Sequence, residues 1–374
     1  MEKRAGVVPV LLLFVLLSFV ATLPGSAALD APLAPLDWPV ECVDCPAGIE
    51  LLGDHALRLD AAGNPRIAYG GEHLSYAHHD GAEWHLEIVD ATDGVGEDAS
   101  LALDAAGAPH ILYDAPGTRE LRYAWHDGAS WHVEVVDGGI WFGGGGLSLA
   151  LDAGGRAHAS YYDWFHRTLK HAWREGATWH VEVVDGTGGT IGSTSLALDA
   201  GGHPHISYAL GDYPAPGQFS VRYARYDGAA WHLETVYTGP NWGMETSLAL
   251  DGAGLAHILL TQKKDYEGED GAVYYARHDG SAWQLETVAT GDVAAPALAL
   301  DAAGEPRVAF EHDFWALGGL RYGWREGGAW HVDTVPDPAR VGRSISLALD
   351  PAGRPHLAYL DEPGSPVRHV KHAW

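Results

Sequence analysis

The feature that most constrains this chain is an internal repeat, of which the stretch from Ser100 to Asp137 is a representative copy. Each copy contains four short runs of strand-forming residues separated by turn-forming residues. A Leu-x-Leu-Asp sequence opens each of seven copies, at spacings of 44 to 52 residues, and ends at Asp60, Asp104, Asp152, Asp199, Asp251, Asp301 and Asp350. Repeats of this length with four strands each are typical of β-propellers.

The two ends of the chain share the seventh copy. A tryptophan opens the fourth run of the other six copies, at Trp84, Trp131, Trp179, Trp231, Trp283 and Trp330, whereas the seventh copy stops at Trp374 before such a run. The missing run is found at residues 38–44, which match residues 131–137 at Trp, Val, Glu, Val and Asp. Sharing one repeat between the ends locks a ring but gains nothing in a linear stack.

We therefore predict an all-β fold, a closed seven-bladed β-propeller with four antiparallel strands per blade, over residues 38–374. An N-terminal strand would complete the C-terminal blade. The repeats open near residues 56, 100, 148, 195, 247, 297 and 346.

The first 28 residues have the layout of a secretory signal peptide. Lys3 and Arg4 precede an apolar run from Val7 to about Leu23, and small residues follow up to Ala28. Residues 29–37 would be a short linker. We expect a secreted or extracytoplasmic monomer without membrane insertion after cleavage; a retained anchor is the alternative.

Charge and cysteine content exclude several partners. The net charge of -27 argues against nucleic acid and anionic membranes, which require a basic surface. Cys42 and Cys45 are the two cysteines, and in an exported protein their spacing favours a local disulfide, or else free thiols, over a metal or redox site. We expect no cofactor and no metal.

Several repeated polar residues are explained by turns. The Asp that closes each opening run would cap a tight turn through its carboxylate. The histidine that begins the second run, as at His110, would hydrogen-bond the same turn, since Arg66 and Arg307 replace it.

The third and fourth runs form a hairpin around Asp127-Gly128. A three-residue loop would place Trp125 opposite Trp131 and Arg122 opposite Glu134. The equivalent expected pairs are Lys170 with Glu182, Arg222 with Glu234, Arg321 with Asp333, Lys371 with Glu41, and Trp374 with Trp38.

Strand parity sorts the loops into two faces. The short stereotyped turns share one face, and the connections that vary between blades share the other. Because binding residues usually lie on loops of a rigid scaffold, we predict that the variable face binds ligand. The candidate residues are Trp141, Phe142, Trp164, Phe165, His166, Tyr213, Trp242, Tyr266, Phe314 and Trp315. The alternative is that these aromatic side chains fold inward and plug the channel mouth.

The repeat pattern LALDxxGxPHIxYxD…LxYAxxDGxxWxxExV resembles that of exported bacterial β-propellers of mostly unknown function. These are similar to fucose-lectin-like propellers and, more loosely, to Asp-box propellers such as sialidases. The Asp-box pattern itself is not matched, because Gly128 directly follows Asp127. The resemblance implies the fold and transfers no site residue.

Three functions remain open from the sequence. The first is a non-catalytic binding module, for carbohydrate or for a protein ligand, that uses the aromatic loops. The second is a glycoside hydrolase or sialidase-like enzyme, which needs two opposed carboxylates; Asp163, Asp313 and Asp361 are the candidates. The third is a protein-interaction scaffold in the cell envelope.

Overall fold

The structure is a computed structural model. It describes residues 38–45, 52–53, 55–141, 146–211, 219–239, 245–263, 271–312, 319–336, 340–362 and 369–374. The predicted signal peptide and linker lie outside the described residues. No helix in the described part is long and apolar enough to cross a membrane.

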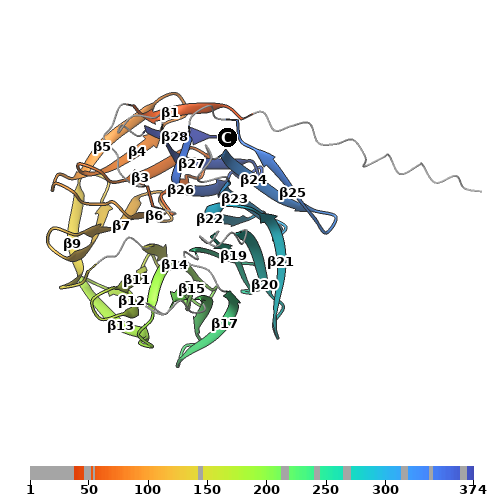
Figure 1. Cartoon of the computed structure of the whole chain (residues 1–374). Helices are drawn as coiled ribbons and strands as arrows, with labels where there is room; N and C mark the ends of the chain where they lie inside the picture. The colour runs from red at the N-terminus through yellow and green to blue at the C-terminus, as the bar shows by residue number, and fades with distance from the viewer. Residues whose placement is uncertain are drawn as a thin grey trace, which may run out of the picture. The chain divides into compact units, whose positions relative to one another are not determined.

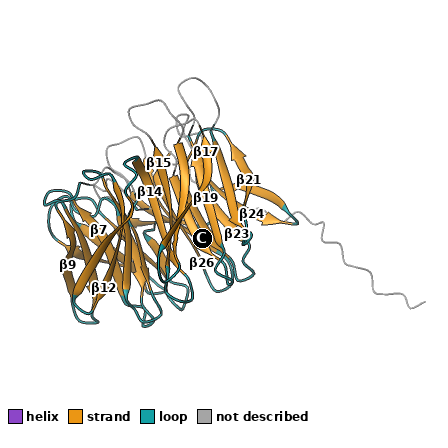
Figure 2. Cartoon of the chain, turned by 90° about the horizontal axis from the view of Figure 1, so that it is seen from below, coloured by secondary structure: helices purple, strands orange, loops and turns teal. Residues whose placement is uncertain are grey.

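Residues 38–374 form seven four-stranded antiparallel sheets arranged in a ring (Figure 1). Figure 2 shows the sheets from the side, standing next to one another. The first three blades are β2 to β5 (Leu57–Leu59, Pro65–Tyr69, Leu74–His79, Trp84–Asp90), β6 to β9 (Ala99–Leu103, Pro109–Ala115, Glu120–His126, Trp131–Gly138) and β10 to β13 (Ser148–Leu151, Ala157–Asp163, Thr168–Glu175, Thr178–Asp185).

The next three blades are β14 to β17 (Thr190–Leu198, Pro204–Gly211, Phe219–Tyr226, Trp231–Gly239), β18 to β21 (Glu245–Leu250, Ala256–Gln262, Ala272–His278, Trp283–Thr290) and β22 to β25 (Val293–Leu300, Pro306–His312, Gly319–Glu326, Ala329–Thr334). Blade seven contains β26 (Arg340–Leu349), β27 (Pro355–Glu362), β28 (His369–Ala373) and β1 (Val40–Asp44). The predicted seven-bladed fold is confirmed.

The N-terminal strand closes the ring as predicted. β1 pairs antiparallel with β28, and both belong to the sheet β1-β28-β27-β26. The structure also joins Cys42 and Cys45 in a disulfide at the end of β1, with 6.2 Å between their Cα atoms.

A tryptophan of each blade packs against the preceding blade. The Trp that opens the outer strand meets an aromatic ring of the preceding third strand edge to face, with centroids 5.2 to 5.7 Å apart. The seven pairs are Tyr76–Trp131, Tyr123–Trp179, His171–Trp231, Tyr223–Trp283, Tyr275–Trp330, Tyr322–Trp38 and His372–Trp84. The same contact therefore recurs around the whole ring, including both interfaces of blade seven.

The outer-strand glutamate strengthens this contact. Trp131 Nε1 donates to Glu87 at 2.8 Å, and Trp179 Nε1 donates to Glu134 at 2.6 Å. The same bond joins Trp231 to Glu182, Trp283 to Glu234 and Trp330 to Glu286, each at 3.1 Å. The repeated Trp and Glu thus form one contact between neighbouring blades.

The hairpin register differs by one residue from our expectation. Tyr123, not Arg122, faces Glu134, and Arg122 faces Val135. The reason is a loop that is one residue shorter than expected: Asp127 N–H donates to the Ser130 carbonyl at 3.2 Å, which leaves Gly128 and Ala129 as the loop. The expected pairs of Lys170, Arg222, Arg321, Lys371 and Trp374 are wrong by the same shift.

In three blades the basic residue of the third strand pairs with the preceding blade, whereas Lys371 pairs with Asp361 of its own blade at 3.5 Å. Arg122 Nη1 lies 3.0 Å from Asp90, the last residue of β5. In the same way Lys170 pairs with Asp137 at 2.9 Å, and Arg222 pairs with Asp185 at 2.7 Å. In those three blades charge complementarity is real, but it operates between blades instead of across a hairpin.

Serine hydroxyls join the innermost strands of neighbouring blades. Each of five serines accepts a backbone N–H from a leucine of the next blade, at 2.9 to 3.1 Å. The pairs are Ser100 with Leu149, Ser148 with Leu196, Ser195 with Leu248, Ser247 with Leu298, and Ser346 with Leu57. Alanine occupies this position in the other two blades, at Ala56 and Ala297.

Replacing Ser195 with alanine should destabilise the ring. The variant leaves the buried Leu248 N–H without an acceptor, which costs about 1 to 3 kcal/mol. Urea unfolding of the S195A variant measures this loss. The exposed hairpin residue Ser130 provides the control, and equal stability of S195A and S130A would contradict the role assigned to these serines.

Candidate functional site

The predicted aromatic residues fall into two groups. Trp141, Trp164, Phe165 and His166 belong to the described residues. The remaining candidates, Phe142, Tyr213, Trp242, Tyr266, Phe314 and Trp315, lie outside them.

Three of these rings are exposed between blades two and three. The exposed fraction is 56% for Trp141, 39% for Trp164 and 73% for Phe165. Trp164 N–H donates to the Trp141 carbonyl at 3.0 Å, and the Arg119 guanidinium lies 5.1 Å from the Trp141 ring centroid. We call Arg119, Trp141, Trp164 and Phe165 the aromatic corner. Their exposure suits contact with a ligand better than filling a channel.

A buried carboxylate holds the turn that carries Trp164 and Phe165. Asp163 Oδ1 accepts the N–H groups of Phe165 and His166 at 3.1 and 3.2 Å. Its Oδ2 lies 2.6 Å from His166 Nδ1 and 2.9 Å from Lys170 Nζ. Burial raises the pKa of Asp163, but the hydrogen bonds from Lys170 and His166 outweigh burial and hold this pKa below its usual value. Asp163 therefore positions the turn as a paired carboxylate.

The other candidates for catalytic carboxylates do not form an opposed pair in the described part. Asp361 is buried and ion-paired with His369 at 2.9 Å and Lys371 at 3.5 Å. Asp313 lies outside the described residues.

Asp98 and Asp114 form a second pair of neighbouring carboxyl groups, at the start of β6. Asp98 N–H donates to Asp114 Oδ1 at 3.1 Å, and Asp98 Oδ2 accepts the Leu147 N–H at 3.0 Å. Burial, together with the charge of Asp114, raises the pKa of Asp98 to about 7. Burial also raises the pKa of Asp114 to about 6. The sequence did not single out this pair, because the two residues belong to different segments of the blade.

The face opposite the variable loops carries the turns between the first and second strands of each blade, and the repeat Asp caps each of these turns. Each repeat Asp accepts the backbone N–H groups two and four residues on, as Asp104 does from Ala106 at 2.9 Å and Ala108 at 2.8 Å. The predicted turn-capping role is confirmed. The corresponding bonds are made by Asp60, Asp152, Asp199, Asp251, Asp301 and Asp350.

The repeated histidines are held between this turn and the third strand. Nε2 of His110, His158, His205 and His257 lies 3.5 to 3.9 Å from the turn Asp. Their hydrogen bond through Nδ1 goes to a third-strand ring, as from His205 to Tyr223. Burial lowers the pKa of His205, so its imidazole is neutral at pH 7. The expected bond to the turn is thus partly replaced by one to the third strand.

A groove opens on this face between blades four and five. It has a volume of about 730 Å³, compared with about 320 Å³ between blades three and four and about 270 Å³ between blades seven and one. Its lining includes Tyr226, Asp227 and Glu234 of blade four and His278 of blade five. Its volume is in the range of small-molecule sites.

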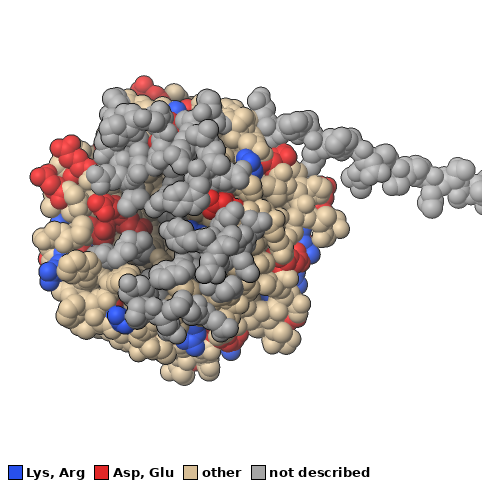
Figure 3. Space-filling model, in the orientation of Figure 1, with Lys and Arg blue, Asp and Glu red and all other residues tan. Residues whose placement is uncertain are grey.

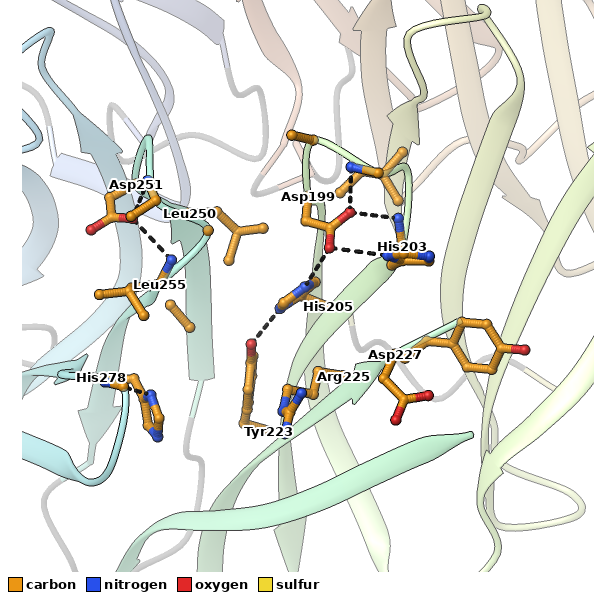
Figure 4. Close-up of a pocket in the computed structure, with 18 of the residues that line it drawn as sticks. Asp199, His203, His205, Tyr223, Arg225, Asp227, Leu250, Asp251, Leu255 and His278 are labelled. Carbon is orange, nitrogen blue, oxygen red and sulfur yellow. Dashed lines mark hydrogen bonds and ion pairs between the residues drawn. The ribbon is translucent and has the colours of Figure 1, made fainter. Parts of the chain in front are cut away.

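Blade four lacks an aromatic stack that three other blades have at the wall of this groove. In blades two, three and six a third-strand Trp stacks on an outer-strand His, as Trp125 does on His132 with centroids 5.1 Å apart. Blade four has Arg225 at this position, and Arg225 Nε lies 4.0 Å from Glu234 Oε1. Figure 4 shows Arg225 beside Tyr223 and below the hydrogen-bonded Asp199 and His205, with His278 on the opposite wall. The signal in the sequence is an arginine where blades two, three and six have tryptophan, which occurs at Arg225 and also at Arg277 of blade five.

Lysine and arginine do not gather into a basic patch on the face drawn in Figure 3. The Lys and Arg side chains of the described residues occur there singly among Asp and Glu. No group of three or more His, Cys, Asp or Glu in the described part has the geometry of a metal site.

No family model and no curated protein sequence matches the chain. Solved structures do match. An ulvan lyase from a new family of polysaccharide lyases, bound to -[GlcA(1-4)Rha3S]-, superposes with a TM-score of 0.60 at 13% identity, over 88% of this chain and 93% of that one. The SapL1 lectin in complex with alpha methyl fucoside superposes with a TM-score of 0.50 at 14% identity, over 78% of this chain and 98% of that one.

A protein of unknown function from Dyadobacter fermentans superposes with a TM-score of 0.52 at 12% identity, over 89% of this chain and 98% of that one. The chain shares their propeller fold. At these identities the likeness concerns the fold, and site residues have to be judged from this chain alone.

Proposed function

We propose that this propeller is a non-catalytic carbohydrate-binding module. The groove between blades four and five carries the proposal, because a guanidinium, a carboxylate and an aromatic ring converge there in a space of about 730 Å³. Arg225 can donate to sugar hydroxyls, Glu234 can accept from them, and the Tyr226 ring offers an apolar surface. A ligand, in this proposal, occupies the place that a tryptophan fills in blades two, three and six.

The lining favours an uncharged sugar. Asp199, Asp227, Glu234 and Asp251 line the groove beside Arg225, and the whole chain has a net charge of -27. An anionic ligand would be repelled by this surplus of carboxylates. The exposed rings of the aromatic corner on the variable-loop face are a second surface for the same class of ligand.

The matching structures support this class of ligand. They include a lectin in complex with alpha methyl fucoside and a lyase bound to a polysaccharide unit. We also propose that the protein acts outside the cytoplasm, since its N-terminus resembles a signal peptide and Cys42 is disulfide-bonded to Cys45.

A glycan array followed by calorimetry on the positive sugars tests the proposal. Arg225→Trp restores the residue of blades two, three and six, so the variant should fold while its indole fills the groove. Binding should weaken about 10-fold to 100-fold, because the hydrogen bonds of a charged donor are lost. The paired variant Trp141→Ala and Trp164→Ala reports on the aromatic corner. Absence of sugar binding, or binding that survives both sets of changes, would refute the proposal.

A further inference from the structure

An arginine breaks a ring of alanines on the innermost strands. The third residue of the repeat Ser-Leu-Ala-Leu-Asp is alanine in six blades, at Ala102, Ala150, Ala197, Ala249, Ala299 and Ala348. Blade one has Arg58 at this position. The sheets come closest together at the axis of a propeller, so a long charged side chain there has to enter the central space.

Arg58 lines a central cavity of about 240 Å³. The cavity is also lined by residues of blades four, five, six and seven, among them Leu196, Ser247, Leu298 and Ser346. The arginine side chain therefore extends from blade one into a space bounded by strands on the other side of the ring.

The guanidinium has no carboxylate partner among the described residues. Its Nη1 donates to the backbone carbonyls of Leu57 at 2.8 Å and His55 at 3.5 Å. Burial lowers the pKa of Arg58 to about 10, which leaves it charged at pH 7. The nearby His55 is neutral, because burial and the charge of Arg58 lower its pKa to about 3. A half-buried cation without a counter-ion loses hydration without gaining a charge partner.

The other polar side chains of the cavity can donate hydrogen bonds. Ser247 Oγ accepts the Leu298 N–H and Ser346 Oγ accepts the Leu57 N–H, so both hydroxyl protons remain available to a ligand. No Asp or Glu belongs to the described lining. Positive charge and hydrogen-bond donors thus face a cavity of about 240 Å³.

We propose that the central cavity is an anion site in which Arg58, Ser247 and Ser346 bind a small oxyanion such as a carboxylate or phosphate. The guanidinium supplies the paired donors that fit two oxygens of one anion, and the serine hydroxyls reach the remaining oxygens. This site lies on the axis of the ring, apart from the groove at Arg225, and does not depend on the proposed sugar binding.

Arg58→Ala is a matched variant, because alanine is the residue of the other six blades. Thermal unfolding of both proteins is measured while sodium phosphate or sodium acetate is raised. We expect the wild-type midpoint to rise by about 2–4 °C more than that of R58A at saturating anion. The general stabilisation that phosphate exerts on folded proteins acts on both proteins and cancels in the difference. Equal responses would overturn the proposal.

Two further experiments locate the bound anion and identify its chemical source. Crystals grown with sodium bromide should show an anomalous peak beside Arg58 in the wild type and none in R58A; no peak in the wild type would overturn the site. Glucuronic acid is compared with acetate, and a response to both assigns the site to the carboxylate group, whether free or carried by a sugar.

A further variant, Asp54→Asn, serves as a control, because Asp54 adjoins His55 and lies outside the described residues. A response that appears only in D54N would refute the site in the native chain.

Discussion

Replacing Trp38 with alanine is expected to lower the free energy of unfolding by about 3–5 kcal/mol. Trp38 precedes β1, is 6% exposed, and packs edge to face on Tyr322 of blade six, with ring centroids 5.4 Å apart. It is the one member of the seven Trp contacts that comes from the N-terminal segment. The change leaves a cavity at the interface between blades six and seven, next to the strand that closes the ring.

Urea unfolding of W38A measures this effect, with the slope of the transition checked against that of the wild type. Trp374→Ala is the control, because Trp374 belongs to the same closing region but is 37% exposed and stacks on His372. It should cost much less than W38A. Equal free energies of unfolding for the two variants would show that the Trp38 contact does not stabilise the closed ring.

The second large effect is a loss of stability as pH rises, caused mainly by Asp98, with a smaller contribution of the same sign from Asp114. Its pKa is raised to about 7 in the folded protein, above the value of about 3.9 in an unfolded chain. Between these values the folded state binds the proton more strongly, so the free energy of unfolding falls as pH increases from about 4 to 7. Because each pKa unit corresponds to about 1.4 kcal/mol, the full loss is about 4 kcal/mol.

Asp98→Asn should remove most of this dependence. An asparagine side chain keeps an oxygen that can accept the Leu147 N–H, and it stays neutral at every pH. D98N should therefore be more stable than the wild type at pH 8 and similar to it at about pH 4, near the unfolded pKa. Asp93→Asn changes an exposed carboxylate nearby, at 94% exposure, and should leave the pH profile unchanged. A wild-type profile that is flat between pH 5 and 8 would rule out a raised pKa at Asp98.

The position of the candidate groove could be read only in part from the sequence. Aligning the copies places Arg225 and Arg277 where four other copies have tryptophan. That a groove of about 730 Å³ lies beside Arg225 could be seen only in the structure, because the stacking of Trp125 on His132 that blade four lacks involves two strands. The aromatic corner was predicted through Trp141, Trp164 and Phe165, and the structure adds their exposure and the nearby Arg119.

The register of the hairpins shows where reasoning from pairs of charges failed. Arg122 and Glu134 have opposite charges twelve residues apart, which suggested that they face each other. In the structure Arg122 forms an ion pair with Asp90 of blade one, and Glu134 accepts a hydrogen bond from Trp179 of blade three. A sequence with seven similar copies offers each residue several partners of the same type, so charge alone does not choose among them.

The amino-acid sequence by itself determined the number of blades, the closure of the ring by residues 38–44 and the capping role of the repeat aspartates, because these depend on period and on contacts within a few residues. The tertiary structure decided which blade each Trp, Glu and Arg touches, how wide the groove at Arg225 is, and that Arg58 faces a central cavity. Those properties arise between strands that are tens to hundreds of residues apart. They depend on turn length and side-chain packing, which local patterns do not specify.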